Sequence, residues 1–401
     1  MNLFFDLIGI VCLLLYLYML KKNTLVSITW AFFIITLGKG VGFLSISETL
    51  LKVMVLLPIF LSIAKGDYEK RQLQTVICGG IAMLFFVLIP LDTSVEFLVK
   101  LRSYMTLITG LLLFALKWKN SDIIDSLKIL SIAPIVNVLL GVIYYRRLIS
   151  SINRIICINI TAYVVILAFF AIYASYRLIM LFHSRKYFIL IIINTGIALG
   201  TMQRMGTLVV LLLLIGIAVT NGRYVKRSVM IGILVSLPFV MIIADIALSN
   251  LISRTFSTAY METASINTSG RSFLWAKLWE TRYGYEWLGH GLGYINTLNF
   301  AYWTETGTMA AHNEFLRFIL ETGYVGCVFL IFIFGTLIRR GIKLFSKKKD
   351  ITKYLLLSFL ILSITDNTVS AAIIFYGFAI LFSISFSINR YSFLEMDYEN
   401  K

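Results

Sequence analysis

The polar residues with the clearest chemical potential in this sequence lie in the stretch MAAHNEFLRFILETGYVG, from Met309 to Gly326. A neutral histidine accepts a proton from a hydroxyl group near neutral pH, so His312 is a candidate general base. Asn313 and Glu314 follow directly and are candidates for binding an acceptor molecule or orienting the imidazole ring. A purely structural role is also open, in which Asn313 caps a helix and Glu314 occupies its first turn.

The helix predicted after His312 adds a charge pattern of its own. It is expected to start near Asn313, so its unpaired N–H groups and the positive end of its dipole face the same site. Arg317 is a candidate substrate contact, but its i,i+4 spacing from Glu321 is also that of a simple ion pair.

A second candidate lies in LGTMQRMGTLVV, from Leu199 to Val210, which places Arg204 between two apolar runs. An arginine at membrane depth is costly, which makes it a functional-site hypothesis by default. Its planar guanidinium matches phosphate oxygens in a bidentate way. The alternative is an arginine at a helix end that extends to the membrane surface.

The longest polar segment, residues 249–313, contains four of the six tryptophans. Within it, SGRSFLWAKLWETRY (Ser269 to Tyr283) has the apolar spacing of an amphipathic helix that includes Trp275 and Trp279. Such a helix either lies at the membrane interface, where tryptophan is enriched, or forms a lid whose aromatic faces stack on sugar rings. The stretch GHGLGY, from Gly289 to Tyr294, is either an anion-binding turn or a plain tight turn.

Composition defines the class of protein that must position these residues. The chain has 401 residues, of which 59% are hydrophobic and only 14% charged, whereas soluble domains are about 25% charged. Continuous apolar runs of transmembrane length recur throughout, which predicts an all-α polytopic integral membrane protein. They argue against a β-barrel, whose strands would appear as short segments of alternating hydrophobicity. The first run ends in Lys21 and Lys22 without a small-residue cleavage site, so we expect a retained helix.

The apolar runs predict about 12–13 transmembrane helices. The predicted spans are 3–20, 25–46, 49–64, 73–91, 99–116, 122–143, 158–181, 187–202, 206–220, 229–248, 314–338, 353–369 and 371–388. The stretch SITDNTVS, from Ser363 to Ser370, interrupts the last two, which alternatively form one re-entrant hairpin. The expected organisation is therefore a transmembrane region (1–248), a large loop (249–313), further helices (314–388) and a cytoplasmic tail (389–401).

The positive charges indicate the orientation of these helices. Basic residues gather in short loops that include 21–22, 65–71, 183–186, 221–227 and 339–353. An even number of predicted spans separates these loops, so all of them lie on one side of the membrane, which the positive charge assigns to the cytoplasm. The net charge of +16 is therefore attributed to membrane topology, and no nucleic-acid partner is expected. Segment 249–313 then lies outside the membrane on the opposite face.

The stretch YYRRLISSINR, from Tyr144 to Arg154, departs from this pattern because it is basic and comes out external. Either the predicted topology is wrong by one span there, or Arg147 and Arg154 are retained to contact an external anionic ligand. The four cysteines lie in apolar segments without a CxxC pair, which supports neither a disulfide framework nor a zinc site.

Three features occur in order: an arginine in TMQRMG, then GRSFLWAKLW…WLGHGLG, then HNEFLRFILETGYVG leading into a helix. Together they resemble the bacterial O-antigen polymerase and O-antigen ligase superfamily of membrane glycosyltransferases. The resemblance covers roughly residues 190–340, whereas the first 180 residues match only as a helical pattern.

The resemblance implies a fold similar to that of GT-C-type glycosyltransferases, with one large periplasmic loop, in the bacterial inner membrane. It implies a glycan donor on undecaprenyl pyrophosphate and a transfer that needs no metal and no cofactor. Carried over onto this sequence, Arg204 and Arg271 would contact the pyrophosphate, and His312 would activate the acceptor hydroxyl. A protein that regulates chain length is an expected partner.

Two activities share this chemistry. A polymerase transfers the growing glycan to another lipid-linked repeat unit, and a ligase transfers it to the lipid A core. The pattern WLGHGLGY before HNEFLRFILETG resembles the polymerases more closely, so a polymerase is the favoured interpretation. A transporter of the same lipid-linked glycan remains an alternative, although transporters tend to have internal repeats that are not evident here.

Overall fold

The structure is a computed structural model that describes residues 2–41, 48–88, 92–145, 161–182, 184, 186–201, 203–220, 271–298, 311–345 and 350–399. In these ranges the chain is almost entirely helical, and β-structure there is limited to an isolated bridge between Tyr68 and Leu116. Five helices are long and apolar enough to cross a membrane, so the predicted all-α polytopic class is confirmed.

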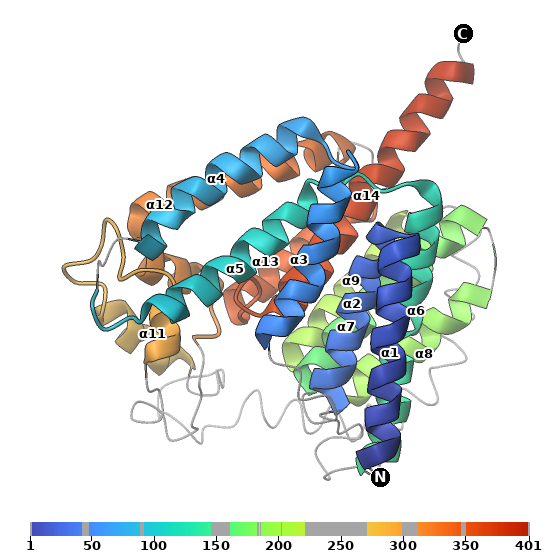
Figure 1. The fold of residues 1–401 in the computed structure, drawn as a ribbon, viewed down its shortest axis with the longest axis horizontal. Helices are drawn as coiled ribbons and strands as arrows, with labels where there is room; N and C mark the ends of the chain where they lie inside the picture. Colours follow the sequence, from blue (N-terminus) through green and yellow to red (C-terminus); the bar gives the residue numbers. More distant parts are fainter. Residues whose placement is uncertain are drawn as a thin grey trace.

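Figure 1 shows the arrangement of the helices. They are α1 (Asn2–Lys22), α2 (Thr24–Val41), α3 (Glu48–Ala64), α4 (Lys70–Leu88), α5 (Phe97–Phe114), α6 (Asn120–Tyr145), α7 (Thr161–Phe182), α8 (Lys186–Gly200), α9 (Arg204–Thr220), α11 (Arg271–Glu280), the 3-10 helix η1 (Tyr294–Thr297), α12 (Glu314–Phe345), α13 (Thr352–Thr365) and α14 (Ala372–Glu399).

Each predicted span except 229–248 coincides with one of these helices, and 229–248 lies outside the described residues. Two helices extend well beyond their predicted carboxyl-terminal ends. The helix α12 continues to Phe345 and α14 to Glu399, so the residues assigned to a basic loop and to a tail extend the helices beyond the apolar spans. Between α13 and α14 the chain turns at 366–371, which leaves two separate helices there.

The helix α7 forms the centre of the bundle and packs against α2, α6, α8, α9 and α14. Its side chains are almost completely buried from Val164 to Leu178, and apart from Ser175 and Arg177 they are apolar or aromatic. Aromatic rings of α7, α13 and α14 interlock there, and Phe170 meets Phe378 edge-to-face with centroids 5.1 Å apart. Gly377 lies against the Phe170 ring, where a side chain would collide, so a small residue permits the close approach.

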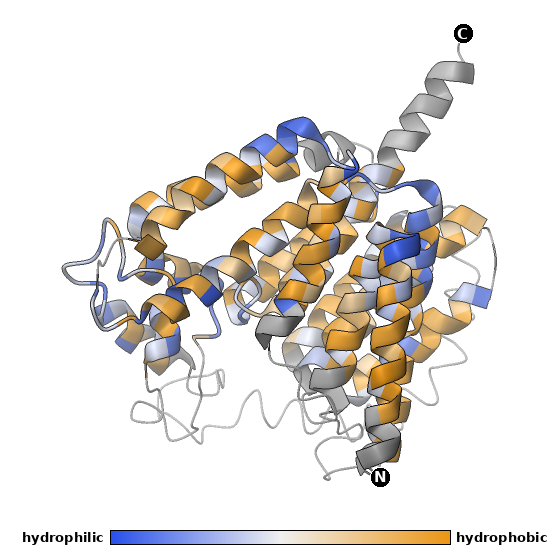
Figure 2. Ribbon diagram, viewed as in Figure 1, coloured by the Kyte–Doolittle hydropathy of each residue, from blue (hydrophilic) through white to orange (hydrophobic). Residues whose placement is uncertain are grey.

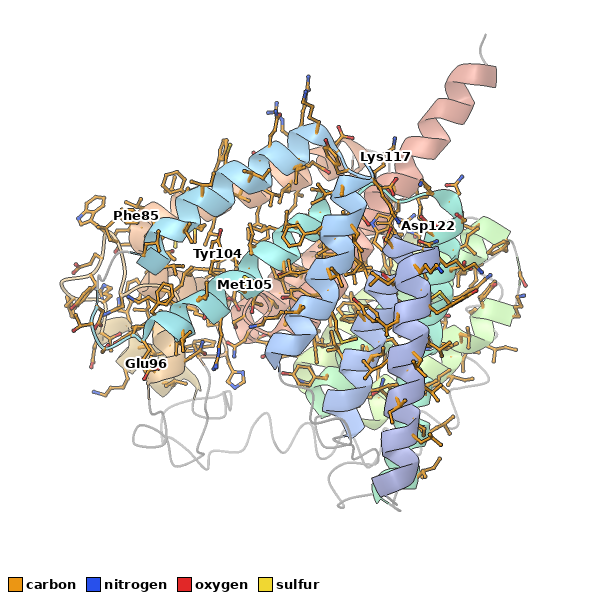
Figure 3. All side chains as sticks on the ribbon, viewed as in Figure 1. Phe85, Glu96, Tyr104, Met105, Lys117 and Asp122 are labelled. Atoms are coloured by element: carbon orange, nitrogen blue, oxygen red, sulfur yellow. The ribbon has the colours of Figure 1, made fainter. Side chains whose placement is uncertain are left out.

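Polar residues gather at the two ends of the bundle, with apolar surface between them (Figure 2). One end, here called the basic end, contains residues 21–23, 65–71, 117–122 and Asp350. Several bonds connect these segments, including Asn23 to Asp122 and the salt bridge between Lys119 and Asp67. Lys117 and Asp122 mark the basic end in Figure 3, and Glu96 marks the opposite end. That opposite end, here called the His312 end, contains residues 92–96, 271–298, 311–313 and 366–371.

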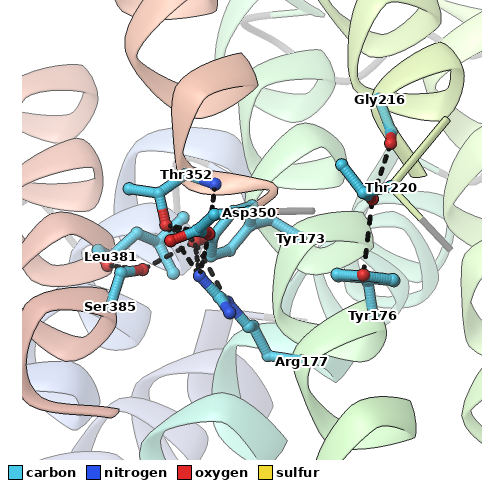
Figure 4. Close-up of polar contacts among 9 residues, drawn as sticks. All are labelled: Tyr173, Tyr176, Arg177, Gly216, Thr220, Asp350, Thr352, Leu381 and Ser385. Atoms are coloured by element: carbon cyan, nitrogen blue, oxygen red, sulfur yellow. Dashed lines mark hydrogen bonds and ion pairs between the residues drawn. The ribbon is translucent and has the colours of Figure 1, made fainter. Parts of the chain in front are cut away.

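A buried ion pair fastens three helices near the basic end (Figure 4). The Arg177 guanidinium of α7 donates to Asp350 Oδ1 at 3.1 Å and to Thr352 Oγ1 at 2.7 Å, at the start of α13. It also donates to the Tyr173 hydroxyl, which lies 2.6 Å from Ser385 Oγ of α14. Only 11% of the Arg177 side chain and 6% of the Asp350 side chain are exposed. Each charge therefore offsets the cost of burying the other.

The substitution Arg177→Met is expected to lower the free energy of unfolding by roughly 3–5 kcal/mol, because it removes the guanidinium that pairs with the buried Asp350 carboxylate. Thermal unfolding of the purified protein in detergent measures the loss. The double variant with Asp350→Asn, which keeps an oxygen acceptor for Thr352, should recover part of it. Losses that simply add in the double variant would contradict a coupled pair.

Candidate active site

The helix α12 is broken near its start, and a loop from residues 286–291 fills the break. Gly323 has φ of 62° and ψ of −170°, which interrupts the helical hydrogen bonds. Backbone bonds to the loop replace them: His290 N to Leu320 O (2.9 Å), Gly291 N to Glu321 O (2.8 Å), Tyr324 N to Glu286 O (2.9 Å) and Val325 N to Trp287 O (3.1 Å). The break is therefore satisfied on both sides by the chain itself, as buried irregular backbone requires.

The glycine-rich stretch GHGLGY, residues 289–294, begins within this loop, which is here called the plug of α12. Its amides donate to backbone carbonyls of α12 and, from Leu292, to Phe86 O of α4. These bonds occupy the amides of His290, Gly291 and Leu292, which favours the tight-turn interpretation for this part of the motif. Gly289, with φ of 69°, approaches so closely that a Cβ there would lie 2.5 Å from the Glu321 carbonyl carbon.

His290 connects this loop to two further segments of the His312 end. Its Nδ1 lies 2.7 Å from Asp92 Oδ2, and its Nε2 lies 2.9 Å from the Thr281 carbonyl oxygen. Its ring is stacked between Tyr285 and Tyr294, with centroids 3.9 and 3.8 Å away. This role of His290 was missed in the sequence analysis, because its partner Asp92 is 198 residues away in the chain.

Burial acts to raise the pKa of Asp92, but hydrogen bonds from Ser94 and from His290 outweigh it and hold the pKa below its ordinary value. Asp92 is therefore ionised at neutral pH and accepts a hydrogen bond from the ring. A carbonyl oxygen also only accepts, so both bonds of His290 form when both ring nitrogens carry protons.

The helix α11 confirms the amphipathic helix predicted around residues 269–283. Leu274 and Leu278 are buried against Val95, Ile295 and Leu320 from other parts of the His312 end. Trp275 donates from its indole Nε1 to the Ala311 carbonyl oxygen at 2.7 Å. This bond fixes the residue that precedes His312, so Trp275 has a structural contact in the described chain.

Trp279 lies one helical turn after Trp275 on α11 and is exposed. The guanidinium carbon of Arg282 lies 4.2 Å from the centre of the Trp279 ring. The Trp279 indole is therefore exposed at the surface of the His312 end, whereas the Trp275 indole is partly buried and hydrogen-bonded.

Asn313 caps α12, since its Oδ1 accepts a bond from Leu316 N at 3.0 Å. Glu314 is buried and accepts bonds from the Arg317 guanidinium and, through Oε2, from Val369 N at 3.1 Å. It thereby ties the start of α12 to the turn between α13 and α14. Arg317 also donates to Glu321 Oε2 at 3.0 Å, which is the i,i+4 pair expected from the sequence.

His312 lies directly before this cap, with φ of 49°, in the left-handed region that non-glycine residues rarely adopt. Its Nδ1 lies 3.2 Å from Asp366 Oδ1 in the turn between α13 and α14. The other ring nitrogen, Nε2, makes no hydrogen bond within the described part of the chain, and 26% of the side chain is exposed. The left-handed backbone, the neighbouring carboxylate and the partly exposed ring are features that a general base can use.

The backbones of Arg204 and Arg271 begin α9 and α11, both at the His312 end. The helix α9 packs against α13, whose last turn precedes Asp366. Arg271 lies one helical turn before Trp275, which contacts Ala311. The structure therefore connects α9 to the helix that precedes Asp366 and α11 to the residue that precedes His312. Arg147 and Arg154 lie outside the described residues.

Comparison with known proteins decides the family of this region. Residues 188–331 match the family model described as O-antigen ligase. This segment is an O-antigen ligase family domain. The match confirms the recognised superfamily of O-antigen polymerases and ligases, a glycosyltransferase-like enzyme family. No curated protein matches the chain.

The O-antigen ligase domain extends from α8 to the middle of α12 and contains Arg204, Arg271 and His312. Asp366 lies beyond its end, in the turn that Glu314 fastens to α12. Within the described residues, no three His, Cys, Asp or Glu side chains are grouped to hold a metal ion.

The substitution Gly289→Ala is expected to destabilise the plug of α12 more than Gly284→Ala does. Both glycines have positive φ, so each alanine costs about 1–2 kcal/mol in backbone strain. A Cβ at Gly289 also collides with the peptide between Glu321 and Thr322, whereas at Gly284 nothing lies within 4 Å. Thermal unfolding compares the variants, and equal losses would contradict the close approach.

Proposed function

We propose that the protein is a surface-polysaccharide polymerase, which transfers a growing glycan from a lipid diphosphate to another lipid-linked repeat unit. The observation that carries the proposal is the contact between His312 and Asp366 directly before the capped start of α12. The family match supports glycosyl transfer of the O-antigen ligase and polymerase type.

In the proposed reaction, His312 Nε2 takes the proton of the acceptor hydroxyl while the hydroxyl oxygen attacks the anomeric carbon of the donor. The bond between that carbon and the diphosphate breaks, and the lipid diphosphate leaves with the bonding electrons. Asp366 accepts a hydrogen bond from Nδ1–H, which keeps Nε2 free as the acceptor and stabilises the imidazolium that forms.

The leaving diphosphate requires positive charge. Arg204 and Arg271 are proposed to bind it bidentately, which stabilises the developing negative charge without a metal ion or other cofactor. Arg147 and Arg154 are proposed as further phosphate contacts. Trp279 is proposed to stack on sugar rings of the substrate, because its indole is exposed beside the site.

The remaining site residues are proposed to support this reaction through contacts within the protein. Trp275 fixes Ala311, Asn313 caps α12, and Glu314 with Arg317 links α12 to the turn that holds Asp366. We therefore assign these four residues to positioning His312 and Asp366.

The acceptor distinguishes the polymerase from its alternative, a ligase that uses the lipid A core. We favour the polymerase because WLGHGLGY followed by HNEFLRFILETG resembles the polymerases more closely. We place the reaction on the periplasmic face of the bacterial inner membrane, since the basic end then lies in the cytoplasm. A protein that regulates chain length is the proposed partner.

The substitution His312→Ala is expected to lower turnover by roughly 10²–10⁴-fold, because the general base is lost. His312→Asn is the matched control for folding, because asparagine tolerates the left-handed backbone but supplies no base. The readout is the lipopolysaccharide banding pattern of a strain that carries each variant in place of the native gene. We expect core plus a single repeat unit for both variants.

Other banding patterns decide against this proposal. Bare core with long glycan still on the lipid carrier would indicate a ligase. An unchanged ladder with either variant would exclude His312 as the base and favour a transporter. The variant Asp366→Asn should reduce turnover less than His312→Ala, because it removes the orienting charge and leaves the base in place.

The substitutions Arg204→Lys and Arg271→Lys test the diphosphate contacts. Lysine keeps the charge but lacks the planar fork, so each change is expected to lower the rate at least 10-fold if the arginine binds two phosphate oxygens. The measurement is polymerisation by purified variants reconstituted with the lipid-linked repeat unit. An unaltered rate for both variants would remove the two arginines from the proposed site.

A further inference from the structure

An aromatic surface at the His312 end lies outside the proposed reaction. It consists of Tyr283, Trp287, Leu288 and Tyr324, here called the aromatic collar. Trp287 is 71% exposed and Tyr283 is 65% exposed, which is unusual for side chains of this size. Trp287 packs edge-to-face on Tyr324 with ring centroids 6.0 Å apart, so the loop and the broken helix α12 present one continuous surface.

The collar continues the exposed apolar stripes of two membrane-spanning helices. On α12 the exposed residues follow helical spacing along one face: Tyr324, Val328, Ile331 and Phe332. On α4 they do the same: Ile77, Ile81, Phe85 and Leu88. Both helices qualify as membrane spans, so lipid tails are the natural neighbours of these stripes. Figure 3 shows Phe85 at the outer edge of the molecule, near the loop end of α4.

The collar lies where the two stripes end. Leu292 N donates to Phe86 O near the last turn of α4, and Trp287 O accepts from Val325 N in α12. The collar therefore occupies the level at which lipid tails give way to headgroups, and Trp and Tyr concentrate at that level in membrane proteins.

One cation accompanies these rings. The Arg282 guanidinium carbon lies 4.2 Å from the centre of the Trp279 ring and 4.4 Å from that of Tyr283. Its NH1 group donates to the Trp279 carbonyl oxygen, which holds the side chain in place at 2.8 Å. Beside an exposed aromatic surface, this charge is complementary to the phosphate groups of lipids.

We propose that the aromatic collar is a membrane-interface anchor, which seats residues 281–288 among the headgroups of the leaflet at the His312 end. Trp287 and Tyr283 insert at the boundary between tails and headgroups, and Arg282 pairs with lipid phosphate. The anchor sets the height of α11 relative to the bilayer and does not depend on which glycan is transferred or on whether transfer occurs.

Tryptophan quenching by brominated lipids tests the anchor in the full-length protein. The protein is reconstituted in phosphatidylcholine vesicles with bromine either near the carbonyl end of the acyl chain or near its terminal methyl. The emission of Trp287→Phe is subtracted from that of the native protein to isolate Trp287. We expect Trp287 to be quenched more strongly by the shallow bromine than by the deep one.

Trp275→Phe is the matched control, because Trp275 is partly buried and bonded to Ala311 on the same external segment. Its difference spectrum should show much weaker quenching at both depths. Equal quenching of the native protein and Trp287→Phe by the shallow lipid would overturn the anchor, and water, glycan or a second copy of the chain would then cover the collar. Stronger quenching by the deep bromine would also overturn it, because the loop would lie below the headgroups.

Discussion

The interaction on which the His312 end depends is the repair of a broken helix by a glycine-rich loop. A transmembrane helix normally satisfies its own peptide groups, and Gly323 prevents this in α12. The loop 286–291 supplies the missing donors and acceptors, so the loop and the helix are each incomplete without the other. Residues far apart in the sequence are thereby brought to fixed places around the start of α12.

Several contacts follow from this repair. The loop carries His290, whose bonds reach the turn before α5 and the end of α11. The helix α11 in turn holds Ala311 through Trp275, and α12 holds the turn between α13 and α14 through Glu314. The strained backbone of His312 lies between these two attachments. It is maintained because both neighbours of the residue are fixed by the surrounding chain.

The helices were predictable from the sequence wherever one continuous apolar run corresponds to one helix. Continuous hydrophobic segments gave the helices, and the alternation of basic loops agrees with the grouping of residues 21–23, 65–71 and 117–122 at one end. The cap at Asn313 and the pair of Arg317 with Glu321 were also predictable, because both depend on spacing within one helix. Asp366 was not predictable as the partner of His312, since 54 residues and a helical hairpin separate them. The break at Gly323 was missed because a single glycine within an apolar run is common in membrane helices.

The buried pair of Arg177 and Asp350 has a consequence for how the protein is made. The two residues are separated by 173 positions in the chain. At a synthesis rate of about 5–20 residues per second, Arg177 is complete for about 9–35 s before Asp350 leaves the ribosome. During that interval the guanidinium lies near the end of its helix, where it can extend to lipid phosphates. The buried pair therefore forms only after the segment that precedes α13 has been synthesised, long after α7 itself is complete.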